Sequence, residues 1–155
     1  MVVAAPEANF GRGFVDIYEY DSDAWSHKQS IAVPQTNEGT HSQFFGTALD
    51  LRGDYLLVGA PYADEGGWAA SDAGAGNNSV GAIYVYHRSG GSFSLQKKIL
   101  RTDLPSSMRF DQLGNGSIRL IDQNGTGALV HEDSRLSNGG HGMVHYIVKS
   151  AFSIN

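Results

Sequence analysis

Hydrophobic residues occur along the chain in short runs and alternations, and this pattern predicts β-strands rather than helices. The stretch from Tyr55 to Ala60 is almost continuously apolar, as expected for a strand that is buried on both faces. The stretch from Ala82 to His87 is rich in β-branched and aromatic residues, which strands favour. No window combines a 3.6-residue period with caps at both ends. The sequence therefore predicts an all-β protein.

The strand pattern occurs more than once in the chain. Residues 13–31 align without a gap with residues 81–99, at an offset of 68 positions. Just upstream, residues 2–6 match residues 57–61. The two copies differ mainly in the length of the link that follows the proline. Such variation is typical of a repeat scaffold, because loops tolerate insertions and strands do not.

A third copy is weaker than the first two. Leu113-Gly114 corresponds to Phe45-Gly46, and residues 142–147 correspond to residues 81–86. A repeat of about 55 to 68 residues with four antiparallel strands has the size of a β-propeller blade. We therefore expect one partial propeller over residues 1–155, with three blade-like repeats. Their approximate bounds are 2–43 for an incomplete copy, 44–104 for the best copy and 110–155 for a degenerate copy.

The middle copy carries four short motifs in order. They are Phe45-Gly46, Gly53-Asp54, Val58-Gly59-Ala60-Pro61 and the stretch from Gly81 to Tyr86. Together they resemble the FG-GAP repeat, which builds the β-propeller of integrin α subunits and of many bacterial surface proteins. The resemblance is strong over residues 44–99, incomplete over 2–31 and poor over 110–152.

The motifs of this repeat have a physical sense. Gly59 and Ala60, which precede Pro61, would let adjacent strands pack closely near the propeller axis. Phe45 would fill the space between blades, together with Trp25 in the first copy and Phe93 in the second.

The resemblance implies a ring of seven blades, whereas this chain holds at most three. Three blades leave apolar faces and strand edges uncovered. We therefore expect an open partial propeller rather than a closed ring. Its expected partners are further blades of a longer parent chain or other copies of the same chain.

Composition excludes several other partners. The chain has a net charge of −5, which argues against nucleic acid as a partner, because phosphate binding needs clustered cations. It has no apolar run of about 20 residues, so no membrane insertion is expected. Cysteine is absent, which excludes disulfides, thiolate zinc sites and cysteine nucleophiles. The first ten residues lack the features of a signal peptide. An extracellular or cell-surface location is therefore implied by the resemblance alone.

The long predicted loop from Tyr62 to Val80 is the best candidate for ligand contacts. It carries Trp68, and an exposed tryptophan on a glycine-rich loop is costly unless it packs or binds. Asp64, Asp72 and Asn77 are the further expected contacts in this loop. An alternative of equal weight is that Trp68 folds back onto its own blade.

Calcium is the one cofactor that this loop suggests. Asp64, Glu65 and Asp72 are its carboxylates, and calcium takes six to eight oxygen ligands. However, the regularly spaced acidic residues of integrin calcium loops are absent, and Asp72 stands seven positions after Glu65. A solvated acidic loop is therefore the simpler interpretation.

The tripeptide Arg52-Gly53-Asp54 matches an adhesion signal that integrins bind, but turn chemistry alone explains Gly53 and Asp54. The resemblance implies a non-enzymatic segment of a secreted or cell-surface protein, whose loops are presented for protein or glycan binding, as in adhesion. One alternative is a fragment of a propeller enzyme that acts on polysaccharide. Such an enzyme needs two carboxylates, or a carboxylate and a histidine, at working distance in a central cleft. A purely structural repeat is the other alternative.

Overall fold

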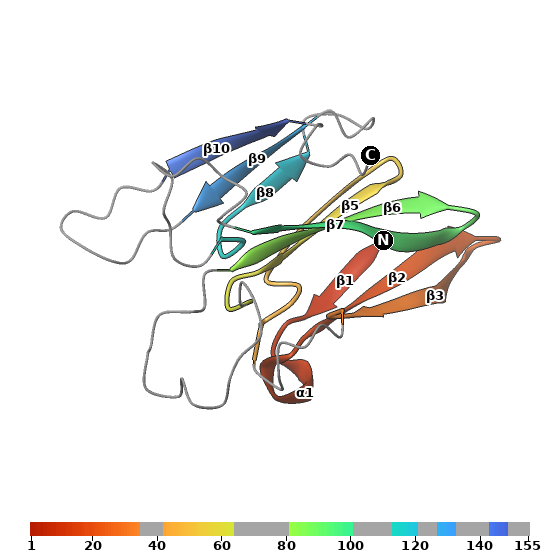
Figure 1. Cartoon of the computed structure of the whole chain (residues 1–155). Coiled ribbons are helices and arrows are strands. Elements are labelled where there is room, and N and C mark those ends of the chain that lie inside the picture. The colour runs from red at the N-terminus through yellow and green to blue at the C-terminus, as the bar shows by residue number, and fades with distance from the viewer. Residues whose placement is uncertain (35–41, 64–80, 101–112, 121–126, 133–142, 149–155) are drawn as a thin grey trace.

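The computed structural model describes residues 1–34, 42–63, 81–100, 113–120, 127–132 and 143–148, and of 129–132 and 143–148 it describes the backbone. The described chain is all-β and consists of three antiparallel sheets, as predicted (Figure 1). The N-terminal sheet contains β1 (Val2–Ala5), β2 (Phe14–Asp21) and β3 (Ala24–Ala32). The central sheet contains β4 (Ala48–Arg52), β5 (Tyr55–Ala60), β6 (Ala82–Ser89) and β7 (Ser92–Leu100). The C-terminal sheet contains β8 (Ile118–Leu120), β9 (Gly127–Glu132) and β10 (Met143–Val148).

One helical element, α1 (Ala8–Gly11), occurs in the described part of the chain. It is a single turn that links β1 to β2, and its interior is not helical. Asn9 and Phe10 have φ angles of 54° and 60°, in the left-handed region. This turn lies outside the sheets and does not change the all-β class.

The N-terminal and central sheets pair their strands in the same way. In the N-terminal sheet Val15 opposes Ile31, and in the central sheet Ile83 opposes Ile99, so both partners are displaced by 68 positions. The same offset relates every other pair of the β2–β3 and β6–β7 ladders. The two stretches that align in sequence therefore fold into equivalent hairpins.

The equivalence includes an irregularity. The β2–β3 register shifts between Ile17 and Tyr18, and the β6–β7 register shifts between Val85 and Tyr86. These positions again differ by 68. A bulge bends a strand and increases its twist, so two sheets that share a bulge also share a shape. Similar shape allows one sheet to pack against the next.

The weak third copy keeps the pairing of the second. Residues 128–130 correspond in sequence to residues 56–58. Ile147 opposes Ala128 in the C-terminal sheet, just as Tyr86 opposes Leu56 in the central sheet. The sequence alignment of residues 142–147 with 81–86 therefore holds at the level of strand register. The sheets do not close into a ring, so the described fold is that of an open partial propeller.

The central sheet lies between the other two, and both of its faces are buried (Figure 1). Within β5, Leu56 faces the core shared with the N-terminal sheet, and Leu57 faces the core shared with the C-terminal sheet. The prediction that Tyr55–Ala60 is buried on both faces is therefore confirmed. The first core contains the side chains of Val15, Ile17, Ile31, Phe45, Val58, Tyr84, Tyr86 and Phe93, and the second those of Ile83, Val85, Ile99, Leu113, Ile118 and Leu120.

Close packing between sheets depends on glycine. A Cβ atom on Gly59 would lie 2.3 Å from the backbone oxygen of Gly114, which is too close for any side chain. Phe45 is fully buried in the core between the N-terminal and central sheets, and Phe93 joins it there. Trp25, the counterpart of Phe93, is 54% exposed. The expectation that Trp25 fills the space between blades is therefore wrong, because Trp25 stands beside the Asp21–Ala24 turn, where its side chain stays more than half exposed.

Candidate functional site

The residues expected to bind a ligand all belong to the long loop that follows Tyr62. Trp68, Asp64, Glu65, Asp72 and Asn77 lie within residues 64–80, outside the described residues. Their roles in ligand or calcium binding stay predictions.

The motif residues of the repeat lie where sheets meet. Phe45, Ala60 and Pro61 are buried, and Gly46 has a φ of 100°, which favours glycine. Gly81 forms a parallel bridge with Leu113, the counterpart of Phe45. Together with Gly59, these residues therefore hold successive sheets against each other rather than exposing functional groups to solvent.

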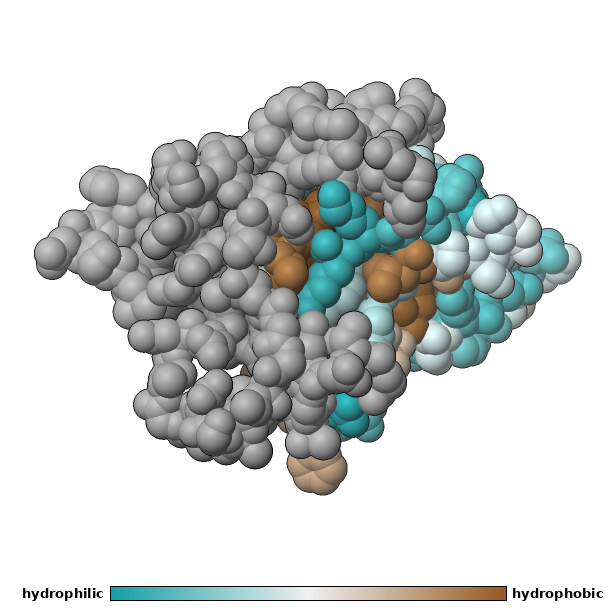
Figure 2. Space-filling model, in the orientation of Figure 1, coloured by the Kyte–Doolittle hydropathy of each residue, from teal (hydrophilic) through white to brown (hydrophobic). Residues whose placement is uncertain are grey.

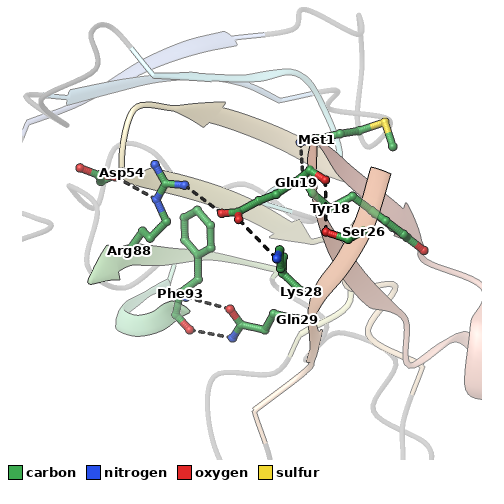
Figure 3. Close-up of polar contacts among 9 residues, drawn as sticks. All are labelled: Met1, Tyr18, Glu19, Ser26, Lys28, Gln29, Asp54, Arg88 and Phe93. Carbon is green, nitrogen blue, oxygen red and sulfur yellow. Dashed lines mark hydrogen bonds and ion pairs between the residues drawn. The ribbon is translucent and has the colours of Figure 1, made fainter. Parts of the chain in front are cut away.

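The N-terminal and central sheets are also joined by polar contacts at their outer strands (Figure 3). Gln29 Nε2 donates to the backbone oxygen of Phe93 at 2.9 Å, and the backbone N–H of Phe93 donates to Gln29 Oε1 at 2.8 Å. The two residues come from β3 and β7. An amide side chain thus pairs with an exposed strand edge in the way a neighbouring strand would.

Charged side chains continue this contact toward the hairpin ends (Figure 3). Arg88 Nη1 lies 3.5 Å from Glu19 Oε1, and Arg88 Nε donates to Asp54 Oδ1 at 3.0 Å. Lys28 Nζ lies 4.0 Å from the other oxygen of Glu19. All four side chains are roughly half exposed, so each pair contributes little stability and stays accessible to a ligand.

Arg52 is the last residue of β4, and Gly53 and Asp54 form the turn that leads into β5. The two charged side chains of this tripeptide have partners within the chain, since Arg52 Nε lies 3.5 Å from Asp50 Oδ2 and Asp54 accepts from Arg88. The backbone oxygen of Asp54 also accepts from the N–H of Arg88 at 2.7 Å. These contacts favour the structural interpretation of the tripeptide over an adhesion signal.

A groove of about 530 Å³ opens between the hairpin ends of the N-terminal and central sheets. We call it the hairpin-end groove. Two of its lining residues, Tyr20 and Trp25, are 59% and 54% exposed, and their ring centroids lie 5.2 Å apart. In Figure 2 the hairpin ends, on the right of the view, carry mainly hydrophilic and intermediate residues. The groove is lined by Met1, Ile17, Tyr18, Glu19, Tyr20, Trp25, Leu51, Gly53, Arg88 and Phe93.

The backbone around this groove is occupied by internal hydrogen bonds. Met1 and Tyr18 exchange two of them, at 2.8 and 2.9 Å. The backbone oxygen of Glu19 accepts from Ser26 Oγ, and both backbone groups of Phe93 bind Gln29 (Figure 3). A ligand in the groove would therefore meet aromatic rings and charged side chains rather than main-chain donors.

A second opening, of about 500 Å³, lies between the central and C-terminal sheets, where β4 faces the segment that leads into β8. Here the Asp50 carboxylate, whose side chain is only 10% exposed, accepts from the backbone N–H of Leu120 at 2.6 Å. Arg119 Nη1 lies 3.8 Å from the same carboxylate. Asp50 thus ties two sheets together, which is a structural role.

Asp16, His27 and Ser30 form a hydrogen-bonded cluster on the N-terminal sheet. Ser30 Oγ donates to Asp16 Oδ1 at 2.6 Å, and His27 Nε2 lies 3.2 Å from Asp16 and 3.1 Å from Ser30. A Ser-His-Asp triad uses one histidine nitrogen for the serine and the other for the carboxylate, whereas here Nε2 faces both. The cluster also lines neither of the two grooves. It has the distances of an acid–base pair but stands outside both grooves.

The described residues contain neither a cluster of metal-binding side chains nor a membrane-spanning helix. No three histidine or acidic side chains there come together as a metal site. No described helix has the length and apolar character needed to cross a membrane.

Comparison with known proteins identifies the repeat. Residues 25–86 match the family model of the FG-GAP repeat, a span that contains β4, β5, all of β3 but its first residue and part of β6. No curated protein sequence shows significant similarity to the chain.

The hairpin-end groove was missed in the sequence because it depends on how two sheets are placed. Tyr20 and Trp25 look like ordinary strand residues, and Trp25 aligns with the buried Phe93. The one available signal was that two aromatic residues flank the Asp21–Ala24 turn. Ring faces on both sides of a turn are a reason to look for a binding surface.

Proposed function

The chain carries an FG-GAP repeat, and we propose that it is a non-enzymatic β-propeller segment of a secreted or cell-surface protein that binds a protein or glycan ligand through its loops. The family resemblance supports the location, since the same repeat builds integrin α subunits and bacterial surface proteins. Asp16 and His27 line neither the hairpin-end groove nor the second opening, which favours binding over catalysis.

The observation that carries this proposal is the exposed aromatic pair in the hairpin-end groove. Tyr20 and Trp25 expose more than half of their surface, which is costly in water unless a ligand covers it. Glu19 and Arg88 stand in the same groove with half-exposed charges. Ring faces beside a charged pair are the features of a small-ligand site, where apolar contact gives affinity and a few polar groups give orientation.

These features favour a glycan over a peptide in this groove. A sugar offers C–H faces that can pack on Tyr20 and Trp25, and hydroxyl groups that can pair with Glu19 and Arg88. A peptide bound by strand addition needs main-chain donors and acceptors, and those around the groove are internally bonded.

Binding of the chain to a panel of immobilised oligosaccharides tests this function. The chain has two tryptophans, so Trp25→Ala and Trp68→Ala separate the groove from the long loop. We expect Trp25→Ala to weaken binding by about tenfold through loss of the stacking face. Leu95→Ala, which shortens an exposed residue outside the groove, serves as the control. Unchanged binding by Trp25→Ala, or no binding to any glycan, would contradict the groove as a glycan site.

A further inference from the structure

The turn between β2 and β3 is acidic and stands beside the aromatic residues of the hairpin-end groove. Asp21 is the last residue of β2, and Asp23 stands in the turn directly before β3. Ser22 and Asp23 have φ angles of 52° and 65°, as in the two-residue turns that match the twist of their strands. We call Asp21 and Asp23 the acidic turn. Both residues are exposed, next to Tyr20 and Trp25, which line the groove.

Two other acidic side chains at this end of the sheets already have cationic partners (Figure 3). Glu19 lies 3.5 Å from Arg88 Nη1 and 4.0 Å from Lys28 Nζ. Asp54 lies 3.0 Å from Arg88 Nε. The charges of these two acids and two bases therefore offset each other, so this network has no excess of either sign.

The acidic turn has only hydroxyl partners within the described part of the chain. Asp21 Oδ1 accepts from Ser22 Oγ at 3.2 Å, and Asp23 Oδ1 accepts from Tyr20 Oη at 3.3 Å. No lysine or arginine among the described residues forms an ion pair with either carboxylate. Because a hydroxyl group carries no charge, this side of the groove attracts cations and repels anions.

The aromatic pair has the same preference. The rings of Tyr20 and Trp25 have centroids 5.2 Å apart and are tilted by 52°, so they are not stacked face to face. The face of an aromatic ring attracts a cation, and tryptophan attracts it most strongly. The hydrogen bond from Tyr20 to Asp23 brings a carboxylate next to these rings. A cation that contacts the rings is therefore also attracted by the acidic turn.

We propose that the glycan bound in the hairpin-end groove is an amino sugar with a protonated amine. Its ammonium group contacts the ring faces of Tyr20 and Trp25, and the carboxylates of Asp21 and Asp23 offset its charge. This inference rests on the proposed function, because it names the class of glycan that the same groove takes. The C–H face of the sugar ring packs on the aromatic surface that the ammonium group leaves free.

Two other charged ligands fit the groove less well. An acidic sugar would need Arg88 for its carboxylate, and Arg88 already pairs with both Glu19 and Asp54. Its charge would also be repelled by the acidic turn. A lysine-rich peptide has the favourable charge, but the main-chain groups around the groove that would fix its backbone are bonded internally.

Calorimetric titration of the full chain with two oligosaccharides of equal length tests this proposal. One is a β-1,4-linked glucosamine oligomer, and the other is its N-acetylated form, which has the same rings without the positive charges. We expect about tenfold tighter binding of the glucosamine oligomer at low salt, and a smaller difference at high salt, because salt screens exposed charges. Equal affinities would overturn the amino sugar and leave the glycan function standing. Binding of neither oligomer or of any other glycan would overturn both. Equally tight binding of oligolysine would show a general cation site and overturn the assignment to a sugar.

A double variant, Asp21→Asn with Asp23→Asn, removes the charge of the acidic turn and keeps its shape, since asparagine tolerates the φ of 65° at the second position. We expect the glucosamine oligomer to bind this variant about tenfold more weakly. Binding of the N-acetylated oligomer should not change, which also shows that the groove is intact. Glu7→Gln is the matched control, because it removes an exposed acid at α1, outside the groove. An unchanged affinity of the double variant for the glucosamine oligomer, or an equal loss in Glu7→Gln, would overturn the proposal.

Discussion

The side-chain amide of Gln29 pairs with both backbone groups of Phe93, 64 positions later in the chain. The contact joins β3 of the N-terminal sheet to β7 of the central sheet, and Phe93 at the same time packs into the core between them. Polar and apolar contacts therefore coincide where the two sheets meet. Substitutions at this pair and at other buried or inter-sheet contacts test what holds the sheets in place.

Replacing Gln29 by alanine should lower the free energy of unfolding by about 2 kcal/mol, because an N–H and a C=O of Phe93 lose their partner. Chemical denaturation followed by circular dichroism measures the change. Gln96→Ala is the control and should cost less than about 0.5 kcal/mol, since among the described residues Gln96 bonds only to nearby Ser94. Similar losses for both variants would show that the Gln29 contact does not join the sheets.

Gly59→Ala should destabilise the chain by about 1–3 kcal/mol, because the added Cβ would lie 2.3 Å from the oxygen of Gly114. Thermal unfolding measures this loss. Gly90→Asn is the control, because nothing lies within 4 Å of its Cβ position and asparagine tolerates the φ of 61° there. A stable Gly59→Ala variant would contradict the close approach of the central and C-terminal sheets.

Tyr86→Phe should leave the fold as stable or make it more stable by about 1 kcal/mol. The Tyr86 hydroxyl is buried, and it finds no hydrogen-bond partner among the described residues. Tyr84→Phe is the matched comparison, since the Tyr84 hydroxyl donates to Gln43 Oε1 at 3.1 Å. Loss of this hydrogen bond should destabilise the fold. The urea midpoint should stay the same or rise in Tyr86→Phe and should fall in Tyr84→Phe. A fall in Tyr86→Phe with no fall in Tyr84→Phe would contradict this assignment.

Burial raises the pKa of Tyr86 well above the usual 10.0, so the folded state holds its proton more tightly than the unfolded state. The contribution of this phenol to the free energy of unfolding is fully present below pH 10.0. It declines as the pH rises further, because the phenol ionises first in the unfolded chain. Unfolding free energies measured at increasing alkaline pH should fall more steeply in the parent chain than in Tyr86→Phe. Parallel curves would contradict a buried, neutral phenol.

Asp50→Ala should cost about 1.5–3 kcal/mol, because the N–H of Leu120 then loses a charged acceptor. Asp50→Asn keeps an oxygen that can accept this hydrogen bond and should cost less. Hydrogen exchange at the Leu120 amide measures the effect locally. Unchanged protection of that amide in Asp50→Ala would contradict the link between the central and C-terminal sheets.

The strands and their pairing could be predicted from the sequence, because both are local properties. The apolar run of Tyr55–Ala60 predicted a buried strand, and the offset of 68 predicted equivalent hairpins, whereas the shared bulge was seen only in the structure. Trp25 was predicted wrongly because its burial depends on a neighbouring sheet rather than on its own strand.

The candidate site was hidden for the same reason. The hairpin-end groove forms where turns of two sheets meet, and no spacing within one strand indicates that Glu19 lies beside Arg88, 69 positions later. The Asp16, His27 and Ser30 cluster depends on how β3 pairs with β2. Residues of the loop predicted to bind, Trp68 among them, lie outside the described residues.

The equivalence of the two hairpins is the central claim, and nuclear Overhauser contacts between opposite strands test it most directly. The account predicts cross-strand backbone contacts for Val15 with Ile31 and for Ile83 with Ile99, with a register shift after Ile17 and after Val85. Contacts in only one hairpin, or shifts at positions that do not differ by 68, would contradict it.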